Sequence, residues 1–257
     1  MHAISAVIIT KNEERNIRSC LESLVDVADE IIVVDDFSTD KTVSICKEFN
    51  AKVISQHWMG FGDQKNTGNR AASHDFILSL DADEAMDDNL VTAIRNEKEK
   101  GLQGAYRLSR LNYFYGKFIR HGLEFPDKKI RLFNRTQAFW ENQLVHETLH
   151  LPSQIMVTTL EGFLKHYTYY RFEDHVLKAN KYTTLASLQY FQKGRKHSLL
   201  KILFSPVFTF IQAYIFKLGF LDGIHGFVLA IMNAHAAFVK YVKLWELRRN
   251  KDQLHEE

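Results

Sequence analysis

The sequence has only two cysteines, Cys20 and Cys46, among its 257 residues. Each lies within a stretch that is predicted to be helical, and two such residues provide no framework of the kind that stabilises small secreted domains. A chain of this length can bury enough apolar surface to fold without disulfides or a structural metal. We therefore interpret both cysteines as buried thiols of a protein that resides in a reducing compartment.

A strong excess of charge of either sign is also absent. The chain has 33 Lys and Arg residues against 31 Asp and Glu residues, a formal net charge of +2 at pH 7. Proteins that bind nucleic acid through its phosphates usually carry a basic excess or a basic stripe. The composition therefore gives no reason to expect nucleic acid as a partner, and it is typical of a globular protein.

Short apolar runs alternate with amphipathic helical patterns over the first hundred or so residues. The runs that predict strands are residues 4–10, 30–35, 53–54 and 76–80. Continuous apolar strands separated by helices indicate a parallel sheet with helices on both faces. The sequence therefore predicts an α/β fold with a Rossmann-like, mostly parallel sheet.

Three of these predicted strands end in polar residues. Thr10 ends the first, Asp35 and Asp36 end the second, and Asp81 and Asp83 follow the fourth. The carboxyl ends of parallel strands meet at one edge of a sheet, where ligands of such folds bind. We therefore expect these side chains to lie in one crevice.

The segment Asp81-Ala82-Asp83 is the sharpest local signal. If the strand stays extended, alternation points both carboxylates the same way, about 6–7 Å apart along the strand. Two such carboxylates suit Mg²⁺ or Mn²⁺ shared with substrate phosphates, and such an ion would assist departure of a diphosphate. The alternative is a solvated strand end that caps the helix following Met86.

The pair Asp35-Asp36 also allows two interpretations. One of these carboxylates can bind the nucleoside of a nucleotide substrate through hydrogen bonds to its base or ribose. Alternatively the segment is a turn, in which Thr39 or Asp40 caps the next helix. Both interpretations hold together if Asp40 caps and Asp36 binds.

Residues 10–14, 33–40 and 80–84 together resemble the family 2 glycosyltransferases of the GT-A fold. The resemblance covers roughly residues 4–150 and is specific in the order and spacing of these segments. Within that family the chain is most similar to bacterial lipopolysaccharide-core β-glycosyltransferases, whose tail also carries a Gly-Phe-Leu-Asp-Gly segment like residues 219–223. The resemblance implies an inverting enzyme that uses Mg²⁺ or Mn²⁺.

The same resemblance implies roles at the donor site. Thr10 and Glu13 would line the nucleoside pocket, and Asp36 would contact the base, commonly uracil. Lys65 and Asn66 match the segment of the family that approaches the base and the phosphates. A UDP-sugar is therefore the expected donor, with UDP-glucose the first choice.

For the metal, the resemblance places Asp81 near the ribose and the ion and makes Asp83 a direct ligand. His166 is a further candidate ligand, although a lone histidine is more often a structural hydrogen-bonding group. One departure from the family is Phe37, where a glycine is usual; we expect it to be tolerated because the neighbouring carboxylate is kept. A Gln-x-x-Arg-Trp segment is lacking, which argues against the processive polysaccharide synthases.

An inverting transfer needs a base that deprotonates the acceptor hydroxyl as it attacks. Glu147 resembles the catalytic carboxylate of the family, and burial near Trp140 would raise its pKa toward a useful value. His146 is the second candidate, because an ordinary histidine titrates near neutral pH. The alternative is that His146 is a half-buried structural residue and Glu147 a surface charge.

The predicted catalytic domain spans residues 1–168, with a nucleotide-sugar half at about 1–100 and an acceptor half at about 101–168. The second half is rich in short strands with Tyr, Phe and Arg. Arg131 and Arg135 lie there, and they either face phosphates of donor or acceptor or are exposed strand residues.

Residues 169–257 are predicted to form a helical C-terminal region. Residues 202–216 and 223–239 contain no charged residue, but each run is shorter than the ~20 residues that a spanning helix needs. These helices either pack on the catalytic domain or a second subunit, or lie in a membrane interface with Lys and Arg near anionic headgroups. We favour attachment to the cytoplasmic face of the inner membrane, because the resemblance implies a glycolipid acceptor there.

The sequence therefore predicts a hexosyltransferase that acts on lipopolysaccharide core or a related glycolipid. A nucleotidyltransferase is less well supported, because such enzymes carry a glycine-rich loop after the first strand and residues 11–14 contain no glycine. A non-catalytic, membrane-associated scaffold that kept the GT-A fold is the other alternative. Retention of Asp36, Asp81, Asp83 and Glu147 argues against it.

Overall fold

The computed structural model describes residues 2–141, 148–195 and 198–253, and side chains as far as residue 250. The chain forms two compact units. Residues 1–111 and 127–167 form the first, here called the sheet unit, and residues 112–126 and 168–257 form the second, the helical unit. The sequence analysis assigned residues 112–126 to the acceptor half of the catalytic domain, whereas here they group with the C-terminal helices.

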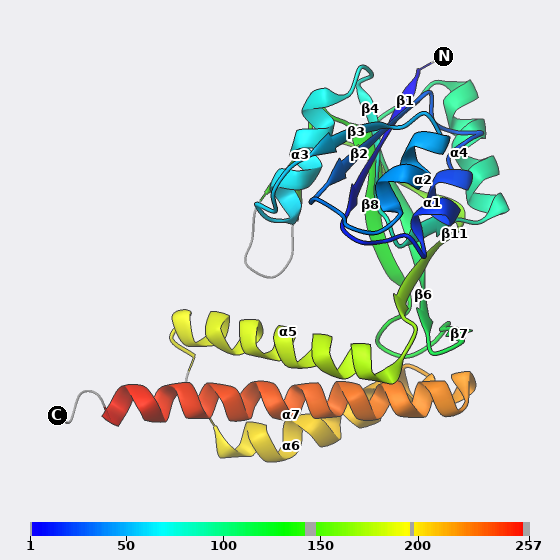
Figure 1. The fold of residues 1–257 in the computed structure, drawn as a ribbon. Helices are drawn as coiled ribbons and strands as arrows, with labels where there is room; N and C mark the ends of the chain where they lie inside the picture. Colours follow the sequence, from blue (N-terminus) through cyan, green and yellow to red (C-terminus); the bar gives the residue numbers. More distant parts are fainter. Residues whose placement is uncertain (1, 142–147, 196–197, 254–257) are drawn as a thin grey trace. The chain divides into compact units, whose positions relative to one another are not determined.

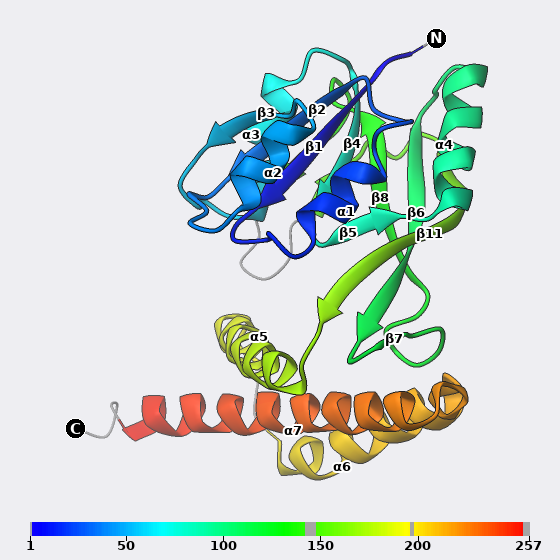
Figure 2. The same cartoon turned by 45° about the vertical axis from the view of Figure 1, so that its right-hand side comes forward.

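The parallel half of the sheet consists of the four strands expected from the sequence, in the order β3-β2-β1-β4. Their bounds are β1 Ile4–Thr10, β2 Glu30–Asp35, β3 Lys52–Ser55 and β4 Phe76–Asp81. Every residue of β1 is buried, which fits a strand covered on both faces. The predicted α/β class is therefore confirmed, and Figures 1 and 2 show the arrangement.

The sheet continues beyond β4 with antiparallel neighbours, in the order β4-β8-β6-β11-β5. These strands are β5 Glu84–Met86, β6 Ala105–Phe114, β8 Asp127–Asn134 and β11 Val157–Tyr169. A short strand β7 (Lys117–Phe118) pairs with the end of β6 in the helical unit. Strands β9 (Phe139–Glu141) and β10 (Thr148–His150) form a separate antiparallel pair.

Helices cover both faces of the sheet, and β1 shows why. Its residues Ile4, Ala6 and Ile8 belong to one buried cluster, whereas Val7 belongs to another, as the two-residue period of a strand requires. The first cluster includes apolar residues of α1 (Ile17–Glu22), α2 (Thr42–Glu48) and α4 (Asp88–Lys100). Cys20 and Cys46 lie buried in that cluster as free thiols, as the sequence predicted.

Helix α3 (Phe61–Ala71), on the opposite face, was not predicted as a helix. Its glycines and polar residues lower the local helix propensity. Tertiary packing stabilises it, because a Cβ at Gly68 would lie 2.3 Å from Val7 Cγ1 and 3.2 Å from Val34 Cγ2. The glycine therefore allows α3 to approach β1 and β2 closely, and this approach carries Lys65 and Asn66 to the site.

The helical unit contains three long helices. They are α5 (Phe172–Gln192), α6 (Leu199–Ile211), which continues as a π-helical segment to Phe216, and α7 (Ile224–Gln253). A short 3₁₀ segment, η2 (Gly219–Asp222), joins α6 to α7. Residues 199–216 and 224–250 are long and apolar enough to cross a membrane by length and composition alone. The first of these helices begins before Lys201 and the second continues past Lys240, so each includes one of the charged residues that bounded the shorter stretches in the sequence analysis.

Candidate active site

The strand register brings the polar strand ends together as the sequence predicted. Thr10 of β1 lies opposite Asp35 of β2, and Ile9 of β1 lies opposite Asp81 of β4. The residues that follow these strands therefore share one edge of the sheet, the edge at which ligands of such sheets bind.

The loops after β1 and β2 are tied to each other at this edge. The backbone N–H of Asn12 donates to Ser38 Oγ at 2.8 Å, and Asn12 Oδ1 accepts from the Thr39 N–H at 2.8 Å. Asn12 has φ +53°, a conformation that asparagine tolerates better than most residues. Asp40 accepts from the N–H groups of Thr42 and Glu14, so it satisfies the first N–H of α2. The N-cap position itself is Lys41, whose side chain makes no capping hydrogen bond. The rim of the site is therefore held by side chains of both loops.

The neighbours Asp35 and Asp36 have different tasks. Asp35 is only 1% exposed and closes the turn by accepting from Ser38 N–H at 2.9 Å and Ser38 Oγ at 2.5 Å. Asp36 Oδ2 lies 2.5 Å from Lys11 Nζ, and Oδ1 accepts from the Trp58 N–H at 3.1 Å. The hydrogen bond from Lys11 lowers the pKa of Asp36 below its usual value. Asp36 is therefore a fixed, ionised acceptor at the rim.

Thr10 and Glu13 were both expected to line the nucleoside pocket. Thr10 Oγ1 is buried and has no hydrogen-bond partner among the described residues, a state that a bound ligand would relieve. Glu13 Oε2 accepts from Asn16 Nδ2 at 2.7 Å, and the Glu13 N–H donates to Thr42 Oγ1 at 2.8 Å. Glu13 therefore helps to join α1 and α2, and its contact with a nucleoside stays a prediction.

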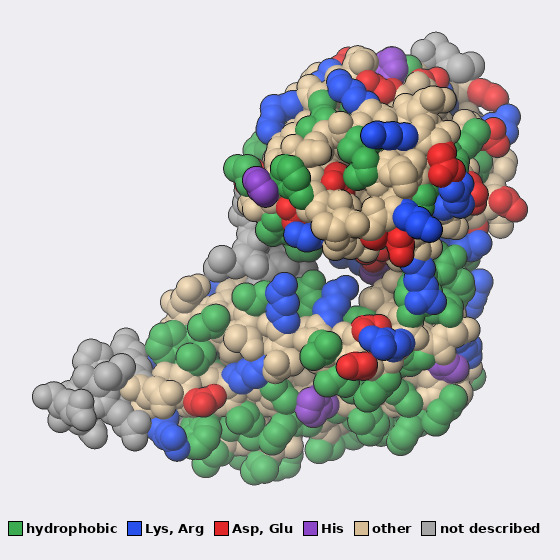
Figure 3. Space-filling view, viewed as in Figure 1, with side chains coloured by type: hydrophobic (Ala, Val, Ile, Leu, Met, Phe, Trp, Pro, Cys, Tyr) green, Lys and Arg blue, Asp and Glu red, His purple; other side chains and the backbone are tan. Residues whose placement is uncertain are grey.

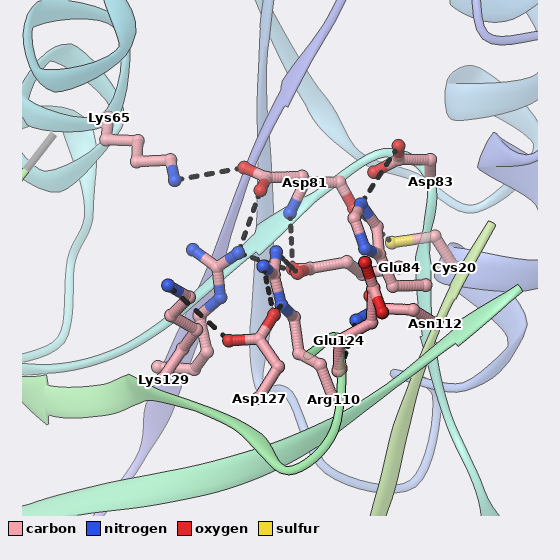
Figure 4. A network of polar contacts seen from close by, with 12 residues as sticks. Cys20, Lys65, Asp81, Asp83, Glu84, Arg110, Asn112, Glu124, Asp127 and Lys129 are labelled. Carbon is pink, nitrogen blue, oxygen red and sulfur yellow. Dashed lines mark hydrogen bonds and ion pairs between the residues drawn. The ribbon is translucent and has the colours of Figure 1, made fainter. Parts of the chain in front are cut away.

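The Asp81-Ala82-Asp83 segment is not extended, contrary to the geometry expected from the sequence. Asp81 is the last residue of β4, and Ala82 and Asp83 form a turn. Asp81 lies 3.0 Å from Lys65 Nζ, whereas Asp83 Oδ2 lies 3.4 Å from His166 Nε2. Figure 4 shows Lys65 and Asp83 on opposite sides of Asp81. The turn therefore directs the two carboxylates to different partners, Asp81 to Lys65 and Asp83 to His166.

Lys65 is a fully buried lysine that α3 delivers to Asp81. Its side chain is 0% exposed, and its Nζ lies 4.7 Å from the centre of the Trp140 ring. The neighbouring Asn66 binds the backbone of Trp140 through both ends of its amide, at 2.7 and 3.0 Å. Asn66 therefore holds β9 beside α3, and its predicted approach to base or phosphate stays untested.

Figure 4 shows Asp81, Glu84, Arg110 and Asp127, which belong to a buried network that the sequence analysis did not anticipate. Arg131 completes the network, because its Nη2 lies 2.8 Å from Asp81 and 2.6 Å from Glu84, a carboxylate with 0% exposure. Arg110 lies 3.2 Å from Glu84 and 2.5 Å from Asp127. The carboxylates of Asp81, Glu84 and Asp127 are thereby paired with Lys65, Arg110 and Arg131, and the half-exposed Lys129 lies 3.5 Å from Asp127. This pairing limits the cost of burying each charge.

The network keeps Asp81 ionised. Burial by itself raises the pKa of Asp81, but Arg131 and Lys65 outweigh burial and hold the pKa well below its usual range. A sequence signal for this network did exist, since Arg110 and Arg131 interrupt apolar strands. Arg135, by contrast, donates to Asn69 O and lies 3.8 Å from Asp75, and it takes no part in the network.

Of the three predicted metal ligands, Asp83 and His166 lie together, whereas Asp81 pairs with other residues. Among residues 2–141, 148–195 and 198–250, no three His, Cys, Asp or Glu side chains lie close enough together to hold a metal ion. Asp83 and His166 offer one oxygen and one nitrogen donor, which fits an ion whose remaining ligands come from substrate phosphates and water. Asp81 is committed to Lys65 and Arg131 instead. The predicted base, Glu147 with His146 as second candidate, lies outside the described residues.

An aromatic cluster beside Asp36 was also not predicted. Phe37 is 49% exposed, has φ +50°, and stacks on His57 at 4.2 Å between ring centres. Trp58 is 48% exposed and packs edge-on against Phe61 at 4.7 Å. The sequence analysis noted Phe37 only as a departure from the family. It could not predict the stack, because the fold, and not the local sequence, brings His57 beside Phe37.

Known proteins resemble this chain over most of its length. The family model "Glycosyl transferase family 2" matches residues 5–153. An uncharacterized glycosyltransferase of Rickettsia typhi is 32% identical over 96% of this chain and 88% of its own. The lipopolysaccharide core biosynthesis glycosyltransferase LpsC of Rhizobium meliloti is 28% identical over 95% of this chain and 92% of its own.

Among solved structures, TarS 1–349 of S. aureus in complex with UDP-GlcNAc matches 96% of this chain and 92% of its own, at 12% identity and a TM-score of 0.49. The family model covers more than half of the chain, and it includes all three loops at the carboxyl edge. The chain is a glycosyltransferase of family 2, with the GT-A fold.

Proposed function

We propose that this glycosyltransferase is an inverting enzyme that transfers a hexose from a UDP-sugar to lipopolysaccharide core or a related glycolipid. The observation that carries the proposal is the convergence of Thr10, Asp36, Asp81 and Asp83 at one edge of the sheet. The name of the relative LpsC supports the acceptor class. Glucose is the first choice of sugar, on the family resemblance alone.

For the donor, we propose that Asp36 accepts a hydrogen bond from the base. Its ionised state, held by Lys11, and its fixed position under the Trp58 N–H suit an acceptor. The unpartnered Thr10 Oγ1 would bond to the nucleoside at the neighbouring strand end. The half-exposed stack of Phe37 on His57 offers an aromatic surface beside the base.

For the metal, we propose that Asp83 and His166 hold Mg²⁺ or Mn²⁺. The charge of Asp81 is balanced by Lys65 and Arg131, whereas Asp83 faces only a histidine among the pairs described here. A bound divalent ion would neutralise the departing diphosphate. Asp81 would then accept a hydrogen bond from a hydroxyl group of the nucleotide-sugar, since its carboxylate is ionised and held in place.

For the acceptor, we propose Glu147 as the base, with His146 as the alternative. Proton removal from the acceptor hydroxyl, with in-line attack on the anomeric carbon, inverts the configuration and releases the nucleoside diphosphate. We place this reaction at the cytoplasmic face of the inner membrane, where an acceptor lipid would be accessible.

The test is release of nucleoside diphosphate from UDP-, GDP- and ADP-sugars with Mn²⁺ or Mg²⁺ and a lipid extract. We expect release from a UDP-sugar, abolished by a chelator and lowered by about 100-fold or more in Asp83→Ala and Glu147→Ala. Asp26→Ala is the matched control and should retain activity, because Asp26 is exposed and precedes the amino end of β2, away from the carboxyl ends of the strands. Absence of release and of nucleotide binding with every donor would instead support the scaffold alternative.

A further inference from the structure

Helix α6 carries its apolar side chains on the outside. None of its residues Leu199–Ile211 is buried, and Leu203, Phe204 and Phe208 are each more than 60% exposed. The joint to α7 and the first half of α7 continue this pattern, with Phe216, Leu221 and Ile224 each more than half exposed. Figure 3 shows hydrophobic side chains gathered along this side of the helical unit, over α6 and α7. These residues are called the apolar face below.

Such a face needs an apolar partner, because monomeric proteins rarely expose large contiguous apolar patches. Three partners are compatible with its chemistry: a bilayer that both helices cross, a single leaflet on which they lie, or a second copy of the chain. The length and hydropathy of the two helices allow the first of these. Other contacts in the helical unit decide between them.

The joint between α6 and α7 is fastened to the charged hairpin 112–126. Asp222, 4% exposed, accepts from the Arg120 N–H at 3.1 Å and the His121 N–H at 2.8 Å. Lys117 Nζ donates to Asp222 O at 2.9 Å, and the Gly122 N–H donates to Lys217 O at 2.9 Å. The joint therefore cannot cross a bilayer unless the charged hairpin crosses with it.

The joint is also too tightly packed to open easily. A Cβ at Gly226 would lie 1.8 Å from Gly219 O, and a Cβ at Gly219 would lie 2.6 Å from Ala213 O. The backbone segments around Gly219 and Gly226 are therefore in direct contact, and a side chain at either position would push them apart. The end of α6, η2 and the start of α7 are therefore one folded corner.

The charge-free parts of the helices are also short for a crossing. Residues 202–216 and 223–239 would rise about 22 and 25 Å as helices, below the ~30 Å of a hydrocarbon core. The later part of α7 bonds to polar groups of α5, since Lys243 Nζ donates to Asn180 Oδ1 at 2.7 Å and Thr183 Oγ1 at 3.0 Å. Neither helix therefore has a charge-free span that matches a bilayer.

The two helices that carry the apolar face also carry cations next to aromatic rings. Lys201 and Lys240 lie 6.0 and 4.9 Å from the centre of the Tyr241 ring, and the Arg249 guanidinium lies 5.2 Å from that of Trp245. Lys217 is exposed at the corner. Anionic headgroups would neutralise these cations, whereas two copies meeting through this face would bring cations of the same charge together.

We propose that α6 and α7 lie in the plane of one leaflet of an anionic bilayer, with the apolar face among the acyl chains and neither helix crossing. This inference goes beyond the proposed reaction and does not depend on the identity of the donor or acceptor.

Binding is tested with vesicles of zwitterionic lipid alone or mixed with an anionic lipid. We expect the full chain to float with the mixed vesicles. Phe204→Asp should weaken binding on the order of tenfold or more, because a charge would replace an aromatic ring that lies among the acyl chains in the bound state. Val25→Asp is the matched control, since Val25 is 61% exposed and lies on the sheet unit. Donor hydrolysis should be unchanged in Phe204→Asp, which separates this inference from the proposed function.

Topology is tested with nitroxide labels at Leu203→Cys, Phe216→Cys and Ile231→Cys in vesicle-bound protein. Both native cysteines are buried and should not react with the label. We expect all three labels at a similar shallow depth, about 5–10 Å below the headgroups, and all reducible from the side of addition. A label at position 216 protected from an added reductant would show a crossing and overturn the proposal. So would a dimer that Phe204→Asp dissociates, together with no vesicle binding.

Discussion

The two units of this protein place their apolar residues in opposite ways. In the sheet unit Ile4, Ile8, Ile32 and Leu78 are all 0% exposed, whereas α6 of the helical unit has no buried residue. Apolar surface stabilises a fold only when it leaves water. The sheet unit is therefore stabilised by its own interior. The helical unit would gain further stability from the proposed leaflet, which would remove its apolar face from water.

The units differ in their buried polar groups as well. The sheet unit neutralises its buried charges in pairs, as Asp81 with Arg131 shows. In the helical unit, Tyr115 Oη contacts His175 Nδ1, and burial lowers the pKa of His175 to about 4. The sheet unit therefore contains a buried network of ion pairs. The helical unit has a single buried acid paired with a lysine, Asp222 with Lys117 at 3.5 Å, among the ion pairs of its described residues, and it also contains a histidine that burial keeps neutral.

Removing a cation from the network should have the largest effect. Arg131→Met would leave Asp81 and Glu84 with less compensation, and we expect a loss of about 3–5 kcal/mol in the free energy of unfolding. Urea denaturation measures this loss. Arg135→Met, in the turn that directly follows β8, is the matched control. We expect at most about 1 kcal/mol there, because its ion pair is partly exposed. Equal losses in the two variants would show that the buried network contributes no more to the free energy of unfolding than the partly exposed ion pair of Arg135.

Two glycine substitutions should separate the units. Gly68→Ala would press α3 away from β1, and Gly226→Ala would open the corner of the helical unit, each costing about 1–3 kcal/mol. We expect Gly68→Ala to lower donor turnover, because α3 carries Lys65. We expect Gly226→Ala to lower vesicle binding more than donor turnover. The opposite pattern would contradict the assignment of tasks to the units.

Acid should destabilise the helical unit before the sheet unit. The folded pKa of His175, about 4, lies below its ordinary value. Its contribution is therefore complete above about pH 6.5 and is lost as pH falls toward 4, about 2 kcal/mol after allowance for solvent screening. Lowered pKa values at Asp81 and Asp127 preserve the contribution of the network until the pH falls below about 4.

Urea unfolding between pH 7 and 4 is followed by tryptophan fluorescence in a Trp58→Phe, Trp140→Phe background, in which Trp245 of the helical unit is the remaining tryptophan. In His175→Phe, whose aromatic ring can replace the stack on Tyr169, we expect the slope between pH 6.5 and 4 to flatten. An unchanged slope in this variant would assign the acid effect to another group.

The smallest effect is expected at Phe37. Phe37→Gly removes a left-handed non-glycine residue but loses the stack on His57, so we expect a stability change below about 1 kcal/mol. If the stack borders the base, the KM for the donor should rise severalfold while kcat stays unchanged. His57→Ala should reproduce the KM effect. A large fall in kcat would instead place Phe37 nearer to the reacting atoms.

Sequence reasoning was sufficient where the signal is local. The apolar runs of β1, β2 and β4 and the polar residues that end them indicated the sheet and its binding edge, because period and strand polarity are properties of short segments. It was insufficient for α3, whose glycines weaken the local pattern while a contact with Val7 requires one of them. It also missed the hairpin 112–126 as part of the helical unit, since that grouping depends on contacts with Asp222.

The sequence by itself determined the α/β fold, the carboxyl edge and the identity of the residues delivered there. Tertiary structure decided which of them meet. Asp81 meets Arg131, fifty residues away, only because β8 lies beside β4, and the turn at Ala82 directs Asp83 to His166. The apolar face was likewise decided by the fold, because burial depends on which helices pack around a residue, and composition alone does not specify that packing.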